Sequence, residues 1–150
     1  MTVAAGTVTT LARAVRKRRV SSTTVVTASI ERIERAEVLN VMTEKLYDEA
    51  LGEARRTDNE ATLQGALLGV STLIKDLEDL AGHSTRKVSL ALRGVPAAVS
   101  SGVVPNRLLQ AGAVVVGKST LPEFAIEGYT ANLLTGVTRL IRSFPGSASE

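Results

Sequence analysis

The sequence predicts an α/β fold in which helices come first and the strands of a central sheet follow. Three observations lead to this expectation. Apolar residues recur at helical spacing over 22–33, with charged residues opposite them. Two short aliphatic runs, 70–75 and 114–116, are typical of buried strands. A helical pattern that ends at Gly112 stands between these runs, and such alternation of helix and strand favours α/β architecture.

Three helices are expected before the first strand. The first contains residues 11–15 and follows two threonines, at positions 9 and 10, that can cap it. The second begins at Ser22 and has a strongly amphipathic pattern. The third runs from about Leu46 to about Arg56. We expect their apolar faces to pack on the sheet, and a partner-binding surface is the alternative.

The strands are expected at Val70–Lys75 and at 114–116. Between them, Gly82 marks a turn, residues 94–105 form an irregular connection rich in glycine and proline, and residues 106–111 end a helix.

The composition excludes several classes of site. The 150 residues contain no cysteine, which rules out disulfides and thiolate metal sites, and His83 is the only histidine. No apolar run reaches the roughly 18–20 residues of a membrane helix, and no apolar signal segment stands near the N-terminus. The net charge of +3 and 3% aromatic content do not favour nucleic-acid binding. We expect a cytoplasmic protein without direct nucleic-acid readout or membrane attachment, and compatible with a homo-oligomer.

The first thirty residues are basic. They carry Arg13, Arg16, Lys17, Arg18 and Arg19 and no acidic residue. We interpret this charge as the solvated end of the first helix, where cations suit the helix dipole. The alternative is an organelle transit peptide, which has a similar Ser/Thr-rich, acid-free composition.

Residues 112–119 match the phosphate-binding pattern G-x-x-x-x-G-K-[ST]. A phosphate-binding loop needs flexible residues whose backbone N–H groups surround the phosphate. The intervening residues here are Ala-Val-Val-Val, which favour a strand, and Pro122 does not suit a helix that starts at Gly117. We therefore interpret the match as coincidental. A phosphate-binding protein is an alternative that rests on this motif alone.

Two other candidate sites have ordinary structural explanations. His83 follows a turn glycine and has no orienting partner nearby in the sequence, so we favour a structural histidine over a general base. The acidic group Asp76, Glu78 and Asp79 suggests a metal site, but such groups near a strand end more often form caps and ion pairs.

Several ordered blocks resemble the amidase signature family. Residues 69–82 contain G-V-S-T-L-I-K-D and then D-L-A-G, similar to the family's G-V-P-x-x-x-K-D-x-x-D-x-x-G. Residues 111–125 resemble its A-G-A-x-x-x-G-K-T-x-x-x-E-F segment, and 130–139 its T-x-N-x-x-x-G-x-T pattern. The resemblance extends over about residues 9–139, including E-R-I-E at 31–34 of the first helices.

The resemblance implies an amidase-signature α/β/α domain with a mixed sheet. Residues 1–150 would be an incomplete domain, with a helical part at about 9–60 and the start of the α/β core at about 66–150. The family hydrolyses linear carbon–nitrogen amide bonds with a Ser–cis-Ser–Lys triad, without metal or cofactor. Lys75 then corresponds to the lysine base. A neutral lysine is needed to accept a proton, and burial lowers a lysine's pKa.

The chain also departs from the family pattern. Ser71 stands in place of proline, Val88 near a usual glycine and Ser101 near a usual aspartate. The cis-serine run is replaced by the short tail at 145–150, in which Ser147 and Ser149 are candidate bridging serines.

The nucleophile segment is not within residues 1–150. We therefore expect this chain to be inactive by itself and only marginally folded, because its strands lack partners. The alternative function is a non-catalytic remnant that acts as a protein-interaction module. The substrate of a complete enzyme would be a small-molecule amide.

Overall fold

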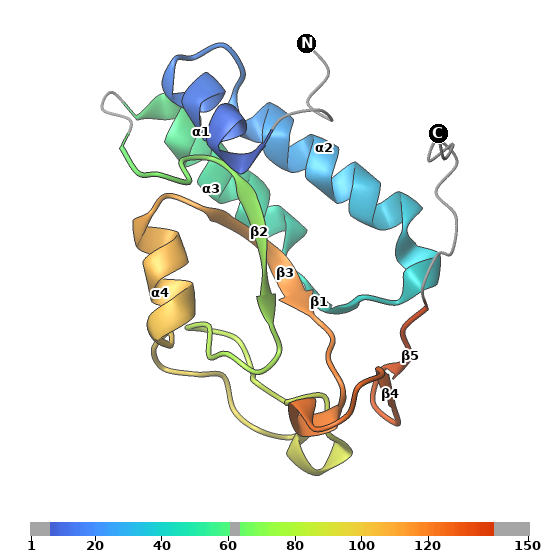
Figure 1. Ribbon diagram of the computed structural model, residues 1–150. Helices are drawn as coiled ribbons and strands as arrows, with labels where there is room; N and C mark the ends of the chain where they lie inside the picture. The colour runs from blue at the N-terminus through green and yellow to red at the C-terminus, as the bar shows by residue number, and fades with distance from the viewer. Residues whose placement is uncertain (1–6, 61–63, 140–150) are drawn as a thin grey trace.

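A computed structural model describes residues 7–60 and 64–139 (Figure 1). The α-helices are α1 (Val8–Arg16), α2 (Ser22–Arg35), α3 (Tyr47–Asn59) and α4 (Val103–Gln110). The strands are β1 (Met42–Lys45), β2 (Ser71–Lys75), β3 (Val114–Ser119), β4 (Ala131–Asn132) and β5 (Gly136–Val137). Short 3₁₀ turns are η2 (Glu37–Leu39), η3 (Leu90–Leu92) and η4 (Glu123–Ala125).

The main sheet has the strand order β1-β3-β2 and is mixed. β2 runs parallel to β3, whereas β1 pairs with β3 in the antiparallel direction. The connection from β2 to β3 contains α4, as a parallel pair requires a long crossover. The two strands predicted from aliphatic runs are therefore confirmed, and the expected mixed sheet is present.

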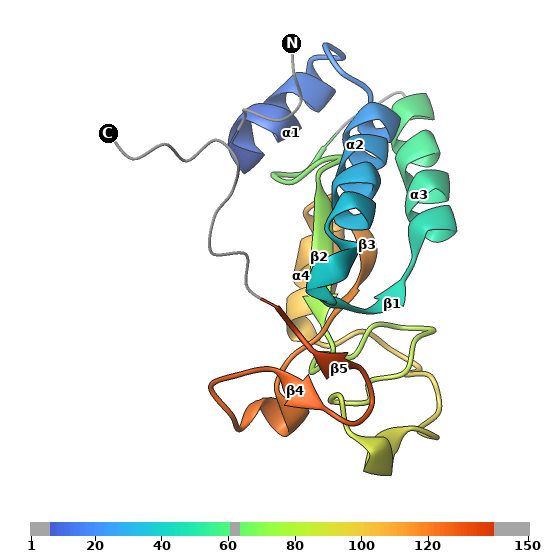
Figure 2. The ribbon, with the colours of Figure 1, turned by 90° about the vertical axis from the view of Figure 1, so that its right-hand side faces the viewer.

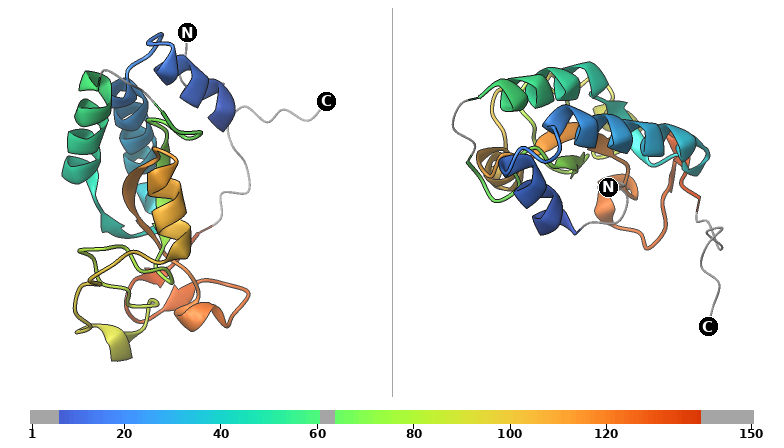
Figure 3. Two further views of the ribbon diagram at one scale, coloured as in Figure 1. Left: turned by 90° about the vertical axis from the view of Figure 1, so that its left-hand side faces the viewer. Right: turned by 90° about the horizontal axis from the view of Figure 1, so that it is seen from above.

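Helices α2 and α3 form one layer against the sheet. Seen from above, they run side by side, with the strands beneath them (Figure 3). The core between the layers consists of Val26, Ile30, Ala50, Ala54, Val114 and Val116. The small side chains on α3 allow the helix backbone to approach β3 closely. The apolar face of α2 is thus a core face, as predicted, and its charged residues 31, 32, 34 and 35 are exposed.

The start of α2 is fixed by a carboxylate from the end of α3. Asp58 accepts hydrogen bonds from the amides of Ser22 (2.6 Å) and Thr23 (3.0 Å) and from the Thr23 hydroxyl (2.7 Å). Partial burial acts to raise the pKa of Asp58, but these hydrogen bonds and the charge of Arg18 outweigh it, so the pKa lies below its ordinary value. The contact joins the start of α2 to the end of α3.

The first helix begins earlier than the sequence indicated. Its N-cap is Thr7, whose hydroxyl accepts from the amide of Thr10. The two threonines at 9 and 10 therefore lie inside α1, and the prediction that they form the cap is wrong. Arg18, just after the helix, donates to the carbonyls of Asp58 and Glu60. Arg18, one of the basic residues of the N-terminal segment, thus caps the C-terminal end of α3.

The carboxyl ends of β2 and β3 lead into a region with little regular structure. The segments that follow these strands lie together beyond the arrowheads, with the β4–β5 hairpin beside them (Figure 2). Lys87, Val88, Phe124 and Ala125 all have left-handed backbone angles, and the amide of Phe124 donates to the carbonyl of Lys87 (3.0 Å). Among the described residues, no helix is long and apolar enough to cross a membrane.

Candidate active site

Lys75 is the last residue of β2, at the carboxyl edge of the parallel strand pair. Side chains alternate along a strand, and accordingly Ile74 and Asp76 are buried while Lys75 is exposed. Within residues 7–60 and 64–139, the Lys75 side chain makes no hydrogen bond or ion pair. The described part of the chain therefore does not bury this lysine. Any desolvation that makes its amine a base has to come from other residues.

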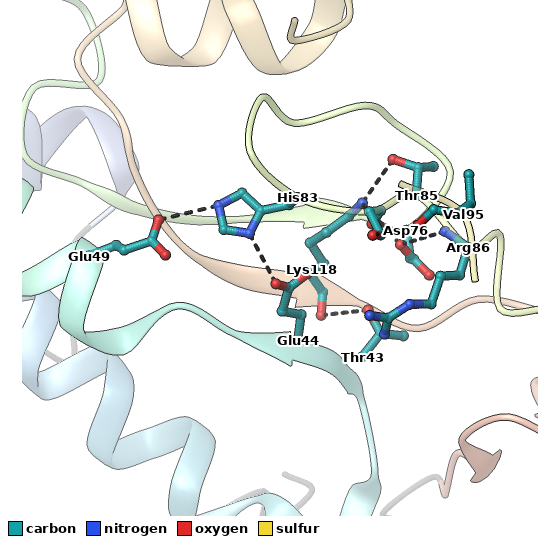
Figure 4. Close-up of polar contacts among 10 residues, drawn as sticks. Thr43, Glu44, Glu49, Asp76, His83, Thr85, Arg86, Val95 and Lys118 are labelled. Carbon is teal, nitrogen blue, oxygen red and sulfur yellow. Dashed lines mark hydrogen bonds and ion pairs between the residues drawn. The ribbon is translucent and has the colours of Figure 1, made fainter. Parts of the chain in front are cut away.

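A second lysine, Lys118 on β3, is fully buried among polar partners (Figure 4). Its strand partner on β2 is Ile74, the residue before Lys75. Its ammonium lies 3.0 Å from Oδ1 of Asp76. It also donates to the carbonyl oxygen of Ser84 (2.7 Å) and to the hydroxyl of Thr85 (3.0 Å). The three acceptors match the three N–H donors of an ammonium, so the buried charge is compensated.

Asp76 is the centre of this cluster. Its backbone amide donates to Ser119 (3.0 Å), and its backbone carbonyl accepts from Lys87 (3.0 Å). Its Oδ2 atom is buried and has no hydrogen-bond partner in the described part of the chain. The pairing of Asp76 with Lys118 agrees with the interpretation of this acidic group as one that forms ion pairs. No three acidic or histidine side chains gather as metal ligands in the described ranges.

His83 lies between two carboxylates (Figure 4). Its Nδ1 is 3.0 Å from Glu44 of β1, and its Nε2 is 3.2 Å from Glu49 of α3. The sequence showed no partner because both lie more than thirty residues away. The imidazole links the loop after β2 to the helical layer, which supports its structural interpretation. Only a protonated ring donates to both carboxylates.

The phosphate-loop motif is part of β3. Residues 114–119 are extended, and Gly117 and Lys118 are buried within the strand. A side chain at Gly117 would collide with the carbonyl oxygen of Glu44 and the methyl group of Met42. This glycine therefore permits β1 to approach β3. The interpretation of the motif as coincidental is confirmed by its conformation.

The positions that depart from the family pattern have local explanations. Ser71 bonds to Ser29 of α2 (2.6 Å between hydroxyls). Ser101 accepts from the amide of Ala81 (3.0 Å), a role open to an aspartate as well. Val88, near a usual glycine, has φ 54° and is fully buried, so a β-branched residue occupies a conformation that suits glycine.

The block at 130–138 forms the β4–β5 hairpin. Asn132 accepts from the amides of Leu134 and Thr135 within the turn, and Gly136 has φ +83°. Thr138 donates its hydroxyl to the carbonyl of Asn40. The polar residues of this block thus build a turn and attach it to the segment before β1.

The two candidate serines, Ser147 and Ser149, lie outside the described residues. An open groove of about 410 Å³ lies between α3, α4 and the loop around 80–83, and Lys75 does not line it. Within the described ranges, the site therefore consists of Lys75 and the buried cluster behind it. It offers an amine for proton transfer at the edge where α/β sheets commonly bind ligands.

Comparison with known proteins identifies the class to which this fold and these blocks belong. The family model named Amidase matches residues 24–140. The chain therefore belongs to the amidase family.

Individual relatives agree with this assignment. The chain is 40% identical over 108 residues to the putative amidase AmiB2 of Mycobacterium tuberculosis, covering 69% of this chain and 23% of that protein. It is 33% identical over 136 residues to the indoleacetamide hydrolase of Bradyrhizobium diazoefficiens, covering 85% of this chain and 25% of that protein. The chain thus spans about a quarter of the length of these relatives.

Solved structures show the same fold. A bacterial aryl acylamidase of the amidase signature family superposes with a TM-score of 0.82 at 27% identity, covering 89% of this chain and 29% of that one. The peptide amidase of Stenotrophomonas maltophilia gives 0.80 at 31% identity, covering 92% and 30%. The mixed α/β arrangement seen here is that of amidase-signature enzymes.

Proposed function

We propose that this chain forms the lysine-bearing part of an amidase that hydrolyses linear carbon–nitrogen bonds of small-molecule amides. The observation that carries the proposal is the position of Lys75 at the carboxyl end of β2, within a family-matched segment. Lys75 is exposed at this edge, whereas the next residue, Asp76, is buried.

In the proposed Ser–cis-Ser–Lys mechanism, neutral Lys75 accepts a proton from a bridging serine. That serine in turn takes the proton of the nucleophilic serine, whose oxygen attacks the amide carbonyl. The proton passes to the leaving amine as the carbon–nitrogen bond breaks, and water then hydrolyses the acyl-enzyme. Backbone N–H donors stabilise the oxyanion. Ser147 and Ser149 remain the proposed bridging candidates.

Residues 1–150 are proposed to be inactive on their own, because the family's nucleophile and oxyanion segment does not occur among them. Ammonia release by the purified 150-residue chain from a simple linear amide, lost in Lys75→Ala, would contradict this part of the proposal.

The role of Lys75 is tested in a chimera. Residues 1–150 replace the matching segment of AmiB2, and ammonia release from simple amides is measured. We expect Lys75→Ala to lower kcat/KM by about 10³-fold or more, as loss of a triad member does. Lys17→Ala, which removes an exposed lysine after α1, is the matched control and leaves turnover unchanged. Equal turnover by the chimera and its Lys75→Ala variant would refute the role of Lys75.

A non-catalytic interaction module is the second candidate. It is favoured by apolar side chains that are largely exposed in the connecting segments and at the start of α4, namely Val99, Val103, Ile126 and Leu133. A stable 1:1 complex of the chain with a partner that lacks amide-hydrolysing activity supports this candidate. Loss of that complex on Val99→Asp and Ile126→Asp, with retained folding, places the partner on this surface.

A further inference from the structure

We propose that Lys118 and Asp76 are positioning residues for Lys75: the buried ion pair fixes the end of β2 and thereby the direction in which Lys75 leaves the sheet. The inference rests on the proposed function of Lys75. It adds two residues that do not themselves touch the reacting atoms.

The first step is the register of the two parallel strands. Ile74 lies beside Lys118, and Lys75 lies beside Ser119. The ladder ends one residue later, where the amide of Asp76 donates to Ser119. Lys75 is therefore the last strand residue before the irregular region, where a strand without further support would fray.

The second step is the way the ion pair closes this end. Lys118 contacts Asp76, which directly follows Lys75, and the loop residues Ser84 and Thr85. One ammonium thus joins the end of β2 to the returning loop. The Lys118 side chain is 0% exposed and that of Asp76 3%, so water does not compete for these contacts.

The third step concerns the direction of Lys75. Asp76 lies just past β2, but its amide bond to Ser119 continues the ladder, and it is buried while Lys75 is exposed. Neighbouring side chains on an extended backbone point to opposite faces, so fixing Asp76 toward Lys118 fixes Lys75 toward the opposite side. The loop tightens this constraint, because the amide of Lys87 donates to the carbonyl of Asp76. A base must hold its position within about 0.5 Å for efficient proton transfer, and an exposed lysine gains this only from a rigid attachment point.

A role in stability alone does not account for an ion pair here. Apolar residues of similar volume often stabilise a protein as well as a buried pair does. What they do not supply is a directional link that joins one strand end to two loop residues. This distinction allows the positioning role to be separated experimentally from stability.

The test uses the 150-residue chain labelled with ¹³C and ¹⁵N. Three variants are compared with the wild type: Lys118→Met, the apolar double variant Lys118→Met/Asp76→Leu, and Ile30→Ala. The last lowers stability from the helical layer and is the stability control. The readouts are the ¹³Cα and ¹³Cβ shifts of Lys75 and hydrogen exchange of the residue-76 and Lys87 amides.

In Lys118→Met we expect the Lys75 shifts to move from strand values toward coil values. Exchange at the two amides should rise about tenfold or more relative to amides of α2. The double variant is expected to recover thermal stability and to keep the altered Lys75 shifts. Ile30→Ala should leave the Lys75 shifts unchanged.

Wild-type Lys75 shifts and exchange in the stability-restored double variant would overturn the inference, since the pair would then serve stability only. The double variant decides this by itself, because it carries no unpaired buried charge. If Lys75→Ala leaves turnover of the chimera intact, the proposed function is wrong. If turnover of the chimera requires Lys75 but the ¹³C shifts of Lys75 are the same in wild type and double variant, only the present inference is wrong.

Discussion

The helical layer and the region beyond the carboxyl ends of β2 and β3 are held together by different forces. In the first, α2 and α3 bury aliphatic side chains against β3. In the second, the elements are short, and a buried ion pair, side-chain-to-backbone hydrogen bonds and left-handed residues define the chain path. Apolar packing tolerates small changes because it is spread over many contacts. A region that depends on a few polar contacts responds sharply to the loss of one.

The same comparison bears on function. The helical layer has its apolar face covered within this chain, whereas the loop region leaves apolar side chains exposed beside Lys75's edge of the sheet. The function that we propose places Lys75 at this edge of the sheet, away from the covered face of the helical layer.

The largest loss of stability is expected from Lys118→Met, which removes the buried ion pair of the loop region. Removal of the ammonium leaves the Asp76 carboxylate buried and unpaired, at a cost of about 3–5 kcal/mol in the free energy of unfolding. Urea unfolding measures this loss.

Lys45→Met provides the matched control for that measurement. Lys45 also pairs with a carboxylate, that of Glu37 at 2.6 Å, but both side chains are exposed. Water and salt screen this pair, so its removal should change stability little. Equal losses in the two lysine variants would show that burial of the Lys118 pair does not set its importance.

A smaller loss is expected from Gly117→Ala at the centre of the sheet. The added methyl group meets the carbonyl of Glu44, so β1 must move away from β3. Overpacking of this kind costs about 1–3 kcal/mol, which thermal unfolding detects. Gly94→Ala is the control, since a side chain there meets no atom within 4 Å. Stabilisation of the wild type by nucleotide would contradict the strand interpretation of this motif.

Some elements of the structure are determined by their local sequence and others by distant residues. The helix α2 and the strands β2 and β3 follow from hydrophobic periodicity, which acts within one element. β1 has no such pattern in M-T-E-K, and it is a strand because Gly117 lets it pair with β3. α1 begins earlier than predicted because Thr7 caps it, instead of Thr9 or Thr10.

In the candidate site, too, some features follow from the local sequence and others depend on distant residues. The place of Lys75 at the end of β2 followed from an aliphatic run and a family motif. The burial of Lys118 depends on Asp76 and Thr85, which lie far from it in the sequence. The available signal was the two-residue period after Val114 and Val116, which places position 118 on their buried side. A lysine at such a position indicates a buried partner, because unpaired buried charge is too costly.

Asp58→Ala tests the main polar contact of the helical layer. It removes the acceptor of two amides at the start of α2, and loss of such a cap costs about 1 kcal/mol. Glu60→Ala is the control, because among the described residues Glu60 forms hydrogen bonds through its backbone and not through its side chain.

The Asp58 contribution should also depend on pH. The pKa of Asp58 is lowered in the folded chain, so its stabilisation is fully present above the unfolded pKa of about 4 and is lost as pH falls through the folded value. The stability difference between wild type and Asp58→Ala should therefore shrink in acid and stay constant between about pH 6 and 8. A difference that grows toward low pH would contradict this sign.

The smallest effect is a gain, expected from Ala125→Gly in the loop region. Ala125 is exposed and has φ 61°, a conformation that costs a residue with a Cβ about 1–2 kcal/mol. Glycine removes that strain but gains freedom in the unfolded chain, which leaves a net stabilisation of about 0.5–1 kcal/mol. Ala131→Gly is the matched control, because Ala131 is an exposed strand residue, where the same exchange is destabilising. Opposite shifts in Tm for the two variants would show that backbone strain is confined to the irregular region. Equal losses of Tm would mean that the turn at 124–125 carries no strain that glycine relieves.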